Sequence, residues 1–249
     1  QPSEGDPIPV RLSLTLQAVN GSSVLCAVCR DLSNRDQLTA ALERRTAQQK
    51  TLGEIAQLSL DEHNIPDLLK GITRRIGHTL DVTYGAVLKK TSDGGSLRLT
   101  AGCGWPRRDY DQATVSAEPA HPVGRSFLES QTIRIDSFES EEDFTRCALL
   151  RSQPIESCLS TSIKQGADEY GVLLAASSLP GQFHASDESF VEEVAQIIGT
   201  ILDQRTAKEA LRKSETKYRR LFKDSRDALF IVAPDGEILA ANPAAETMF

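Results

Sequence analysis

The sequence predicts an α+β fold in which a central antiparallel sheet with flanking helices lies between two long helical linkers. Three observations lead to this prediction. A one-sided apolar stripe runs through residues 65–80 at helical spacing. Short apolar runs separated by turn residues follow between residues 84 and 177. Apolar residues also recur at helical spacing through residues 34–60 and 187–222. Strands grouped together, rather than alternating with helices, are typical of an antiparallel sheet.

The chain opens on a predicted β-hairpin, followed by the first linker helix. Residues 11–19 alternate apolar and polar side chains, Asn20-Gly21 forms a turn, and residues 24–29 form the returning strand. Residues 34–60 then carry apolar residues at helical spacing, with polar Arg45 and Gln49 between them. The pattern predicts a helix and an imperfect coiled coil. Its apolar positions are Leu38, Leu42, Leu52, Ile55 and Leu58.

The central domain is predicted to begin near Asn64 with the striped helix and to continue as strands. Asp93-Gly94-Gly95 forms the turn between the first two strands, and a helical insert separates these from the last three. The predicted strands are residues 84–90, 97–101, 132–135, 157–163 and 171–177, and the predicted short helices are residues 124–130 and 143–151.

A second linker helix is predicted to run without a break from residue 187 to residue 222, about 54 Å at 1.5 Å per residue. We expect its apolar first half to join two copies of the chain. Polar Gln204, Lys208 and Glu215 leave two interpretations open: a solvated helix face, or a weakened dimer seam that can shift register. The full seam is Phe190, Val194, Ile197, Ile201, Gln204, Lys208, Leu211, Glu215, Tyr218 and Phe222.

The final segment is predicted to form two short strands and the start of a helix. Residues 228–232 and 237–240 are the strands, and Pro234-Asp235-Gly236 is the turn between them. Asn242 is expected to cap a helix that has Pro243 at its first position.

Composition excludes several classes of function. A formal net charge of −7 argues against a nucleic-acid-binding surface, which needs clustered Lys and Arg. The apolar runs are too short for a membrane helix, so we expect no direct membrane contact. Five cysteines at irregular spacing fit a reducing compartment, and we expect the cytoplasm. The four histidines lack metal-ligand spacing, so no metal site is predicted.

Both ends of the chain resemble parts of PAS domains. The strand, Pro-Asp-Gly turn and Asn-capped helix of the final segment resemble the opening of a PAS domain. Asp31-Leu32-Ser33 resembles the motif that closes one, in which Asp31 and Arg35 would pair. The resemblance implies partial PAS strands at both ends.

Residues 52–204 resemble a GAF domain. The resemblance rests on Gly171-Val172-Leu173-Leu174 with the following Phe183, Asp187 and Glu188, and on the stretch from Val123 to Asp136. It divides the chain into a PAS end (1–33), a helical linker (34–60), a GAF domain (61–204), a second linker (205–222) and a PAS start (223–249). Such arrays resemble the input half of bacterial sensor histidine kinases, diguanylate cyclases and phosphodiesterases.

The resemblance bears on possible ligands. Cyclic-nucleotide-binding GAF domains carry an Asn-Lys pair before Phe-x-x-x-Asp-Glu. Here Ser177-Ser178 stands in that place, so Asp187 is expected to lose its ion-pair partner and cyclic nucleotides are not expected to bind. The Cys-His dipeptide of bilin-binding relatives is absent, and the cofactor is unknown. Aromatic and mixed-polarity residues near the insert suit a small-ligand pocket. These residues are Trp105, Tyr110, His121, Arg125, Cys158 and Tyr170, and His121 is also the candidate for a haem ligand.

We therefore expect a non-enzymatic sensory module that forms a homodimer through its helical linkers. It would bind a small ligand or act as a dimerising relay to an output kinase or a cyclic-di-GMP enzyme. One alternative is a ligand-free dimerisation spacer. Another is a GAF-fold methionine sulfoxide reductase that uses Cys103, Cys147 and Cys158.

Overall fold

The computed structural model describes residues 10–19, 22–31, 33–61 and 64–248, and side chains from residue 38 onward within these ranges, residue 61 excepted. Its centre is a six-stranded antiparallel sheet in the order β5-β4-β3-β8-β7-β6. The strands are β3 (Tyr84–Lys90), β4 (Ser96–Cys103), β5 (Thr114–Ser116), β6 (Ile133–Ile135), β7 (Ser157–Gln165) and β8 (Asp168–Ser177). The α+β class is confirmed.

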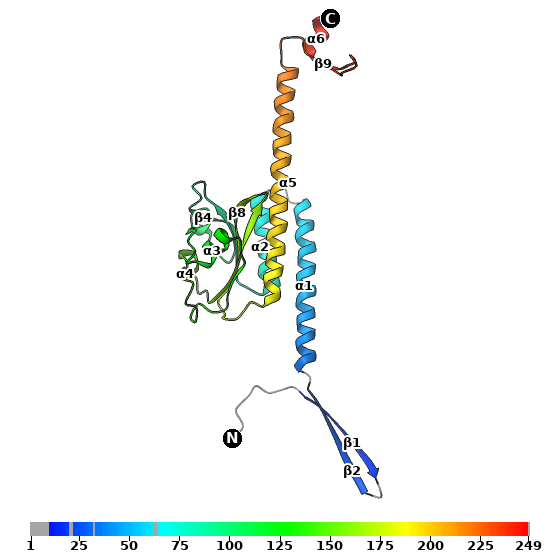
Figure 1. Cartoon of the computed structure of the whole chain (residues 1–249), viewed down its shortest axis with the longest axis vertical. Coiled ribbons are helices and arrows are strands. Elements are labelled where there is room, and N and C mark those ends of the chain that lie inside the picture. Colours follow the sequence, from blue (N-terminus) through cyan, green and yellow to red (C-terminus); the bar gives the residue numbers. More distant parts are fainter. Residues whose placement is uncertain (1–9, 20–21, 32, 62–63, 249) are drawn as a thin grey trace.

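Helices cover the two faces of the sheet unequally. Long helices α1 (Ser33–Asp61), α2 (Ile65–Leu80) and α5 (Ala185–Lys223) lie on one face, here called the helix face (Figure 1). The other, the insert face, is covered by residues 104–156, including the short α3 (Pro122–Glu129) and α4 (Ala148–Arg151). Helix α5 continues past the domain towards the C-terminal end.

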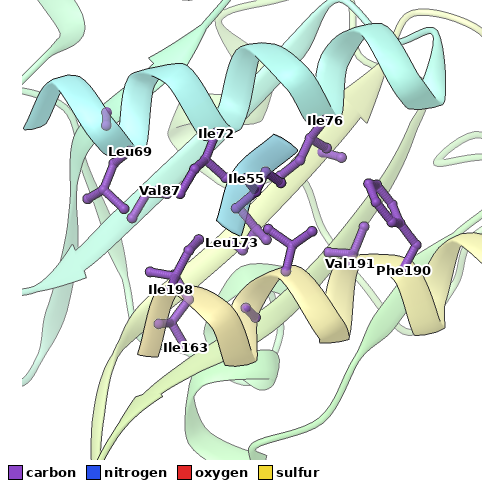
Figure 2. Close-up of a cluster of buried hydrophobic side chains, with 14 of the residues drawn as sticks. Ile55, Leu69, Ile72, Ile76, Val87, Ile163, Leu173, Phe190, Val191 and Ile198 are labelled. Carbon is purple, nitrogen blue, oxygen red and sulfur yellow. The ribbon is translucent and has the colours of Figure 1, made fainter. Parts of the chain in front are cut away.

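The core on the helix face explains why the striped segment folds as a helix. Leu69, Ile72 and Ile76 of α2 are buried against Val87 and Leu173 of the sheet (Figure 2). Each fully buried side chain of this size contributes roughly 1.5–3 kcal/mol, more than helix propensity supplies over the same residues. Packing of one apolar stripe therefore fixes the position of α2.

Apolar residues of both linker helices pack on the chain's own sheet, whereas the prediction placed them between two copies. Phe190, Val194 and Ile201 of α5 are buried in the core on the helix face, as is Ile55 of α1. The prediction that the first half of the α5 seam joins two copies is therefore wrong for these residues. A helix stripe faces one surface only, and here that surface is the chain's own sheet.

Three local predictions also need correction. The predicted helix 143–151 is helical only from Ala148, in α4. Strand β5 was not predicted, because its sequence, Thr-Val-Ser, contains a single apolar residue and so shows no alternation. The strands β7 and β8 extend further towards their shared turn than predicted, to Gln165 and from Asp168.

The two ends form separate small elements. Strands β1 (Val10–Val19) and β2 (Ser22–Asp31) pair antiparallel from Val10↔Asp31 to Val19↔Ser22. The turn at Asn20-Gly21 and the Asp31 and Arg35 side chains lie outside the described residues. At the other end β9 (Phe230–Val232) pairs with β10 (Ile238–Ala241), and α6 (Pro243–Met248) follows.

Asn242 holds the C-terminal elements together. Its Oδ1 accepts hydrogen bonds from the backbone N–H of Ala245 and of Leu229, both at 2.9 Å, and its Nδ2 donates to the Asp227 carbonyl at 2.9 Å. Asn242 is fully buried. The predicted cap is confirmed, and the same side chain also fixes the entry to β9.

Candidate functional site

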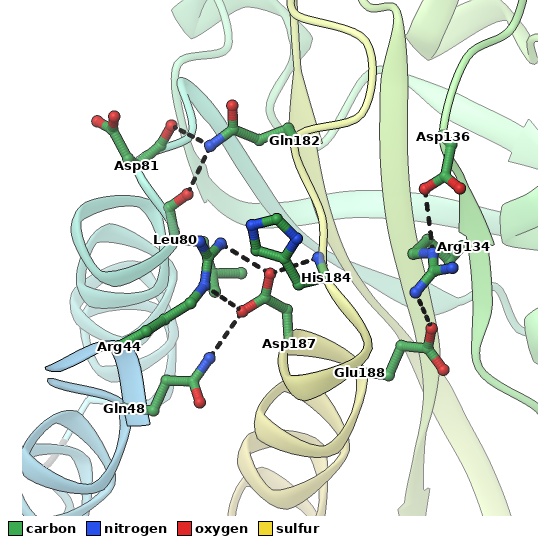
Figure 3. A network of polar contacts seen from close by, with 10 residues as sticks. All are labelled: Arg44, Gln48, Leu80, Asp81, Arg134, Asp136, Gln182, His184, Asp187 and Glu188. Carbon is green, nitrogen blue, oxygen red and sulfur yellow. Dashed lines mark hydrogen bonds and ion pairs between the residues drawn. The ribbon is translucent and has the colours of Figure 1, made fainter. Parts of the chain in front are cut away.

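The most connected polar group of the domain is Asp187, in the first turn of α5. Its carboxylate is completely buried. It accepts hydrogen bonds from Arg44 Nε at 2.9 Å, Arg44 Nη2 at 2.8 Å and Gln48 Nε2 at 2.7 Å, both residues belonging to α1 (Figure 3). The backbone N–H of His184 donates a fourth bond at 2.8 Å. A carboxylate at a helix N-terminus also interacts favourably with the helix dipole. We call this cluster the α5 junction.

Two further contacts anchor the same end of α5. Gln182 Nε2 donates to the carbonyls of Leu80, at 3.0 Å, and Asp81, at 3.3 Å, where α2 ends. Arg134 of β6 forms ion pairs with Glu188 of α5 at 2.6 Å and with Asp136 at 3.0 Å. The start of α5 is thus connected to α1, to the end of α2 and to the edge of the sheet.

The prediction that Asp187 lacks an ion-pair partner is wrong. The missing lysine is replaced by Arg44, which lies 143 residues earlier, on the linker helix. The sequence carried no local signal for this pair, since the pattern of α1 is that of a coiled coil. The consequence is structural: a linker helix supplies the cation that completes the domain.

The six predicted ligand-binding residues do not converge on one cavity. Trp105 and Cys158 are buried in the core on the insert face, and Tyr110 packs against it. The Trp105 Nε1–H donates to the Gly85 carbonyl at 2.9 Å, and its ring lies 5.2 Å from that of Tyr84. These contacts make Trp105 a core anchor.

His121 and Arg125 brace the loops around α3. His121 Nδ1 lies 3.0 Å from the Thr145 carbonyl. Arg125 Nε donates to the Pro119 carbonyl at 3.0 Å, and its guanidinium lies 4.2 Å from the centre of the Phe144 ring. Both side chains therefore connect the segment before α3 to residues 144–145.

Tyr170 lies on the wrong face of the sheet for the predicted pocket. It packs against the core on the helix face, with Lys89 Nζ 5.4 Å from the centre of its ring. The reason is a β-bulge: Ile163 pairs with Gly171 and Lys164 with Glu169, so Tyr170 is an extra residue in β8. A bulge reverses the alternation of side chains beyond it, and this bulge moves Tyr170 away from the other five residues.

The three described cysteines do not share a site. Cys147 and Cys158 lie in the core on the insert face, whereas the Cys103 thiol donates to the Thr73 carbonyl of α2 at 3.4 Å. Burial raises the pKa of all three thiols, most strongly that of Cys158. Buried thiols of raised pKa are poor nucleophiles.

The described residues contain no cluster of three or more His, Cys, Asp or Glu side chains arranged to hold a metal ion. In the same part of the chain, no helix is both long and apolar enough to cross a bilayer.

Comparison with protein-family models identifies the central domain. The GAF domain model matches residues 64–202, more than half of the chain. This chain belongs to the GAF family. A PAS domain model matches residues 216–249, so α5 runs directly from the GAF domain into a PAS region. The comparison with curated proteins gave no match.

Solved structures share the GAF fold at low sequence identity. The GAF domain of a phosphoenolpyruvate-protein phosphotransferase from Coxiella burnetii aligns with a TM-score of 0.59 and 16% identity, over 66% of this chain and 98% of that one. Its Acinetobacter counterpart gives 0.56 and 16%, over 66% and 97%. The free methionine-R-sulfoxide reductase from Neisseria meningitidis gives 0.55 and 17%, over 64% and 91%. These likenesses establish the fold.

Proposed function

We propose that this chain is a relay module of a signal-transduction protein, in which the GAF domain passes a displacement of the incoming helix α1 to the outgoing helix α5. The α5 junction carries this proposal. Arg44 and Gln48 of α1 hold a buried carboxylate in the first turn of α5. Charge-assisted hydrogen bonds are short and directional, so a small displacement of α1 strains the start of α5 directly.

The family matches support a transfer of displacement through α5 to a second sensory domain. Residues 216–249 match a PAS domain, and the end of α5 lies within that match. A continuous helix between two sensory domains transmits rotation and translation with little loss. The module acts as a homodimer in the cytoplasm, upstream of an output kinase or an enzyme of cyclic-di-GMP metabolism.

The packing of the insert face supports a relay that works without a ligand at the predicted residues on that face. Trp105, Cys158 and their neighbours fill this face with apolar side chains. Reductase chemistry like that of the Neisseria protein has less support, because Cys103 lies on the helix face while Cys147 and Cys158 are buried thiols.

Hydrogen exchange on an Arg44→Met variant tests the relay. Removing Arg44 leaves a buried carboxylate short of a charged donor, which costs about 1–3 kcal/mol locally. We expect faster amide exchange both in α1 from residue 44 and in the first turns of α5. Lys50→Met is the matched control: it removes one positive charge from the same helix, at a side chain that is 78% exposed. Faster exchange confined to α1, with α5 unchanged, would show that the two helices are not coupled and would overturn the proposal.

A further inference from the structure

The turn between β7 and β8 holds α5 at the point where this helix leaves the domain. Every residue of α5 from 206 to 221 is exposed, and Figure 1 shows this part of the helix extending past the domain. At the exit the backbone N–H of Gly166 donates a hydrogen bond to Asp203 Oδ2 at 3.0 Å. Gln165 Nε2 donates a second one to Thr206 Oγ1 at 2.9 Å. We call these two hydrogen bonds the exit contacts.

The turn that makes the exit contacts is partly separated from the sheet. We call residues 164–169 the hairpin tip. The bulge at Tyr170 lies between this tip and the rest of the β7–β8 ladder, and only the last two pairs of the ladder lie beyond it. A bulge disrupts the ladder locally and bends the strand that carries it. The tip can therefore change its angle without breaking the pairs that precede the bulge.

Helix α3 contacts these strands on both sides of the bulge. The buried hydroxyl of Ser126 donates to the Ser160 carbonyl of β7 at 3.0 Å, before the bulge. About one helical turn later, Ser130 ends α3 and donates its hydroxyl hydrogen to Glu169 Oε1 in the tip. Lys164 Nζ lies 3.9 Å from the same oxygen. A shift of α3 relative to β7 consequently acts on the angle of the tip.

These contacts form one connected series from α3 to the exit of α5. We propose that the hairpin tip is a second input to the proposed relay, through which a displacement of α3 moves the exit of α5. The inference goes beyond the relay from α1, because its input lies on the insert face and it uses no residue of the α5 junction.

The length of α5 beyond the exit makes a small movement of the tip effective. About 26 Å of helix follows Thr206, so a tilt of about 10° at the exit displaces the end of α5 by about 4 Å. The PAS match begins within this part of the helix. The tip therefore acts on the orientation of the PAS region, whereas the α5 junction acts on the start of the helix.

The two ends of the series differ in exposure. The hydrogen bond between Ser126 and Ser160 is buried, and the exit contacts are exposed to water. Water competes for an exposed hydrogen bond, so the exit contacts can break and form again at a small net cost. Helix α3 thus stays attached to β7 while the tip holds or releases α5.

A neighbouring contact offers a different route from α3 to α5. Thr132, two residues after the end of α3, donates to Glu192 Oε1 at 2.6 Å. Glu192 lies in the first part of α5, far from its exit. A signal carried by this contact would change α5 around residue 192, so the place of the change separates the two routes.

The exchange rates of single amides, measured by NMR on the whole chain, test the exit contacts. Asp203→Ala removes the acceptor and should accelerate exchange of the Gly166 amide by about two- to tenfold, as expected for one hydrogen bond. Asp203→Asn keeps a carbonyl acceptor and should preserve most of the protection. Glu209→Ala, at an exposed position further along the same helix, is the control. An unchanged Gly166 amide in Asp203→Ala would overturn the proposal.

Ser130→Ala tests the coupling between α3 and α5. We expect faster exchange both at Gly166 and at residues 203–207 of α5, by about two- to tenfold. Glu169→Ala removes the other partner and should cause the same changes, with no further increase in the double variant. Ser140→Ala is the matched control, because its hydroxyl bonds only to the nearby Ser137 carbonyl.

Three outcomes would contradict the coupling: faster exchange confined to the tip, faster exchange around residue 192 with the exit unchanged, or equal effects of Ser130→Ala and Ser140→Ala. The relay from α1 is tested separately by Arg44→Met, at the other end of the domain-bound part of α5. Either input can therefore fail in its own experiment while the other succeeds.

Discussion

Gly199 allows α5 to approach the sheet more closely than any other residue type would permit. A Cβ at this position would lie 2.1 Å from the Lys164 carbonyl oxygen of β7, which is backbone and cannot turn away. To restore the ordinary contact distance of 3.4 Å, the helix and the strand would have to move about 1.3 Å further apart. Ile198 and Leu202, buried beside it, would lose contact with the sheet.

We therefore expect Gly199→Ala to destabilise the domain. Overpacking costs about 1–3 kcal/mol, of which the better helix propensity of alanine offsets about 0.5–1 kcal/mol. The net cost of about 0.5–2 kcal/mol corresponds, for a chain of this size, to a fall in melting temperature of about 1–8 °C. Differential scanning calorimetry at a protein concentration below that of association measures the change.

Gly53→Ala is the control with the opposite sign. Gly53 is also in the interior of a long helix, but a Cβ there would meet nothing within 4 Å. Its substitution should raise the melting temperature slightly, because only helix propensity changes. If Gly199→Ala were as harmless as Gly53→Ala, the close approach of α5 to β7 described above would be incorrect.

Two further predictions concern the C-terminal elements and the effect of pH. Asn242→Ala removes three hydrogen bonds and should accelerate amide exchange in residues 227–248 while leaving the central sheet unchanged; equal acceleration in the sheet would contradict the separation of these elements. Burial raises the pKa of the Cys147 and Cys158 thiols above the ordinary 9.0, so their contribution to stability is complete below that pH and is lost as the pH rises through the higher folded values. Urea unfolding between pH 8 and pH 10 should show a declining free energy, and a Cys147→Ala/Cys158→Ala variant should show a smaller decline; equal slopes for both proteins would refute the assignment.

The elements that could be predicted are those whose pattern has a single interpretation. The α2 stripe and the Asn242 cap are of this kind, because neighbours in sequence supply the whole signal. The seam of α5 has two interpretations, since an apolar stripe containing Phe190 and Ile201 is the same whether a sheet or a second helix covers it. Only the packed structure distinguishes them.

The site was less predictable than the fold. Tyr170 was grouped with the other candidate pocket residues because it is aromatic, and one bulge residue in β8 places it on the helix face instead. Arg44 could not be found, because its partner Asp187 is remote in sequence and arginines on exposed helices are common. Residue type alone could not assemble a site whose members meet only after α1 packs on the domain.

The unbroken course of α5 from the GAF domain into the PAS region fixes the angular phase between the two. Each residue of an α-helix turns the chain by about 100° and advances it by 1.5 Å. One residue inserted near Ala210 would therefore turn the PAS start through more than a quarter of a circle relative to the junction at Asp187 while hardly changing its distance. Seven inserted residues, nearly two full turns, would almost restore the angle and lengthen the helix by about 10 Å. Lengths of this helix among functional variants should accordingly differ in steps of about seven residues.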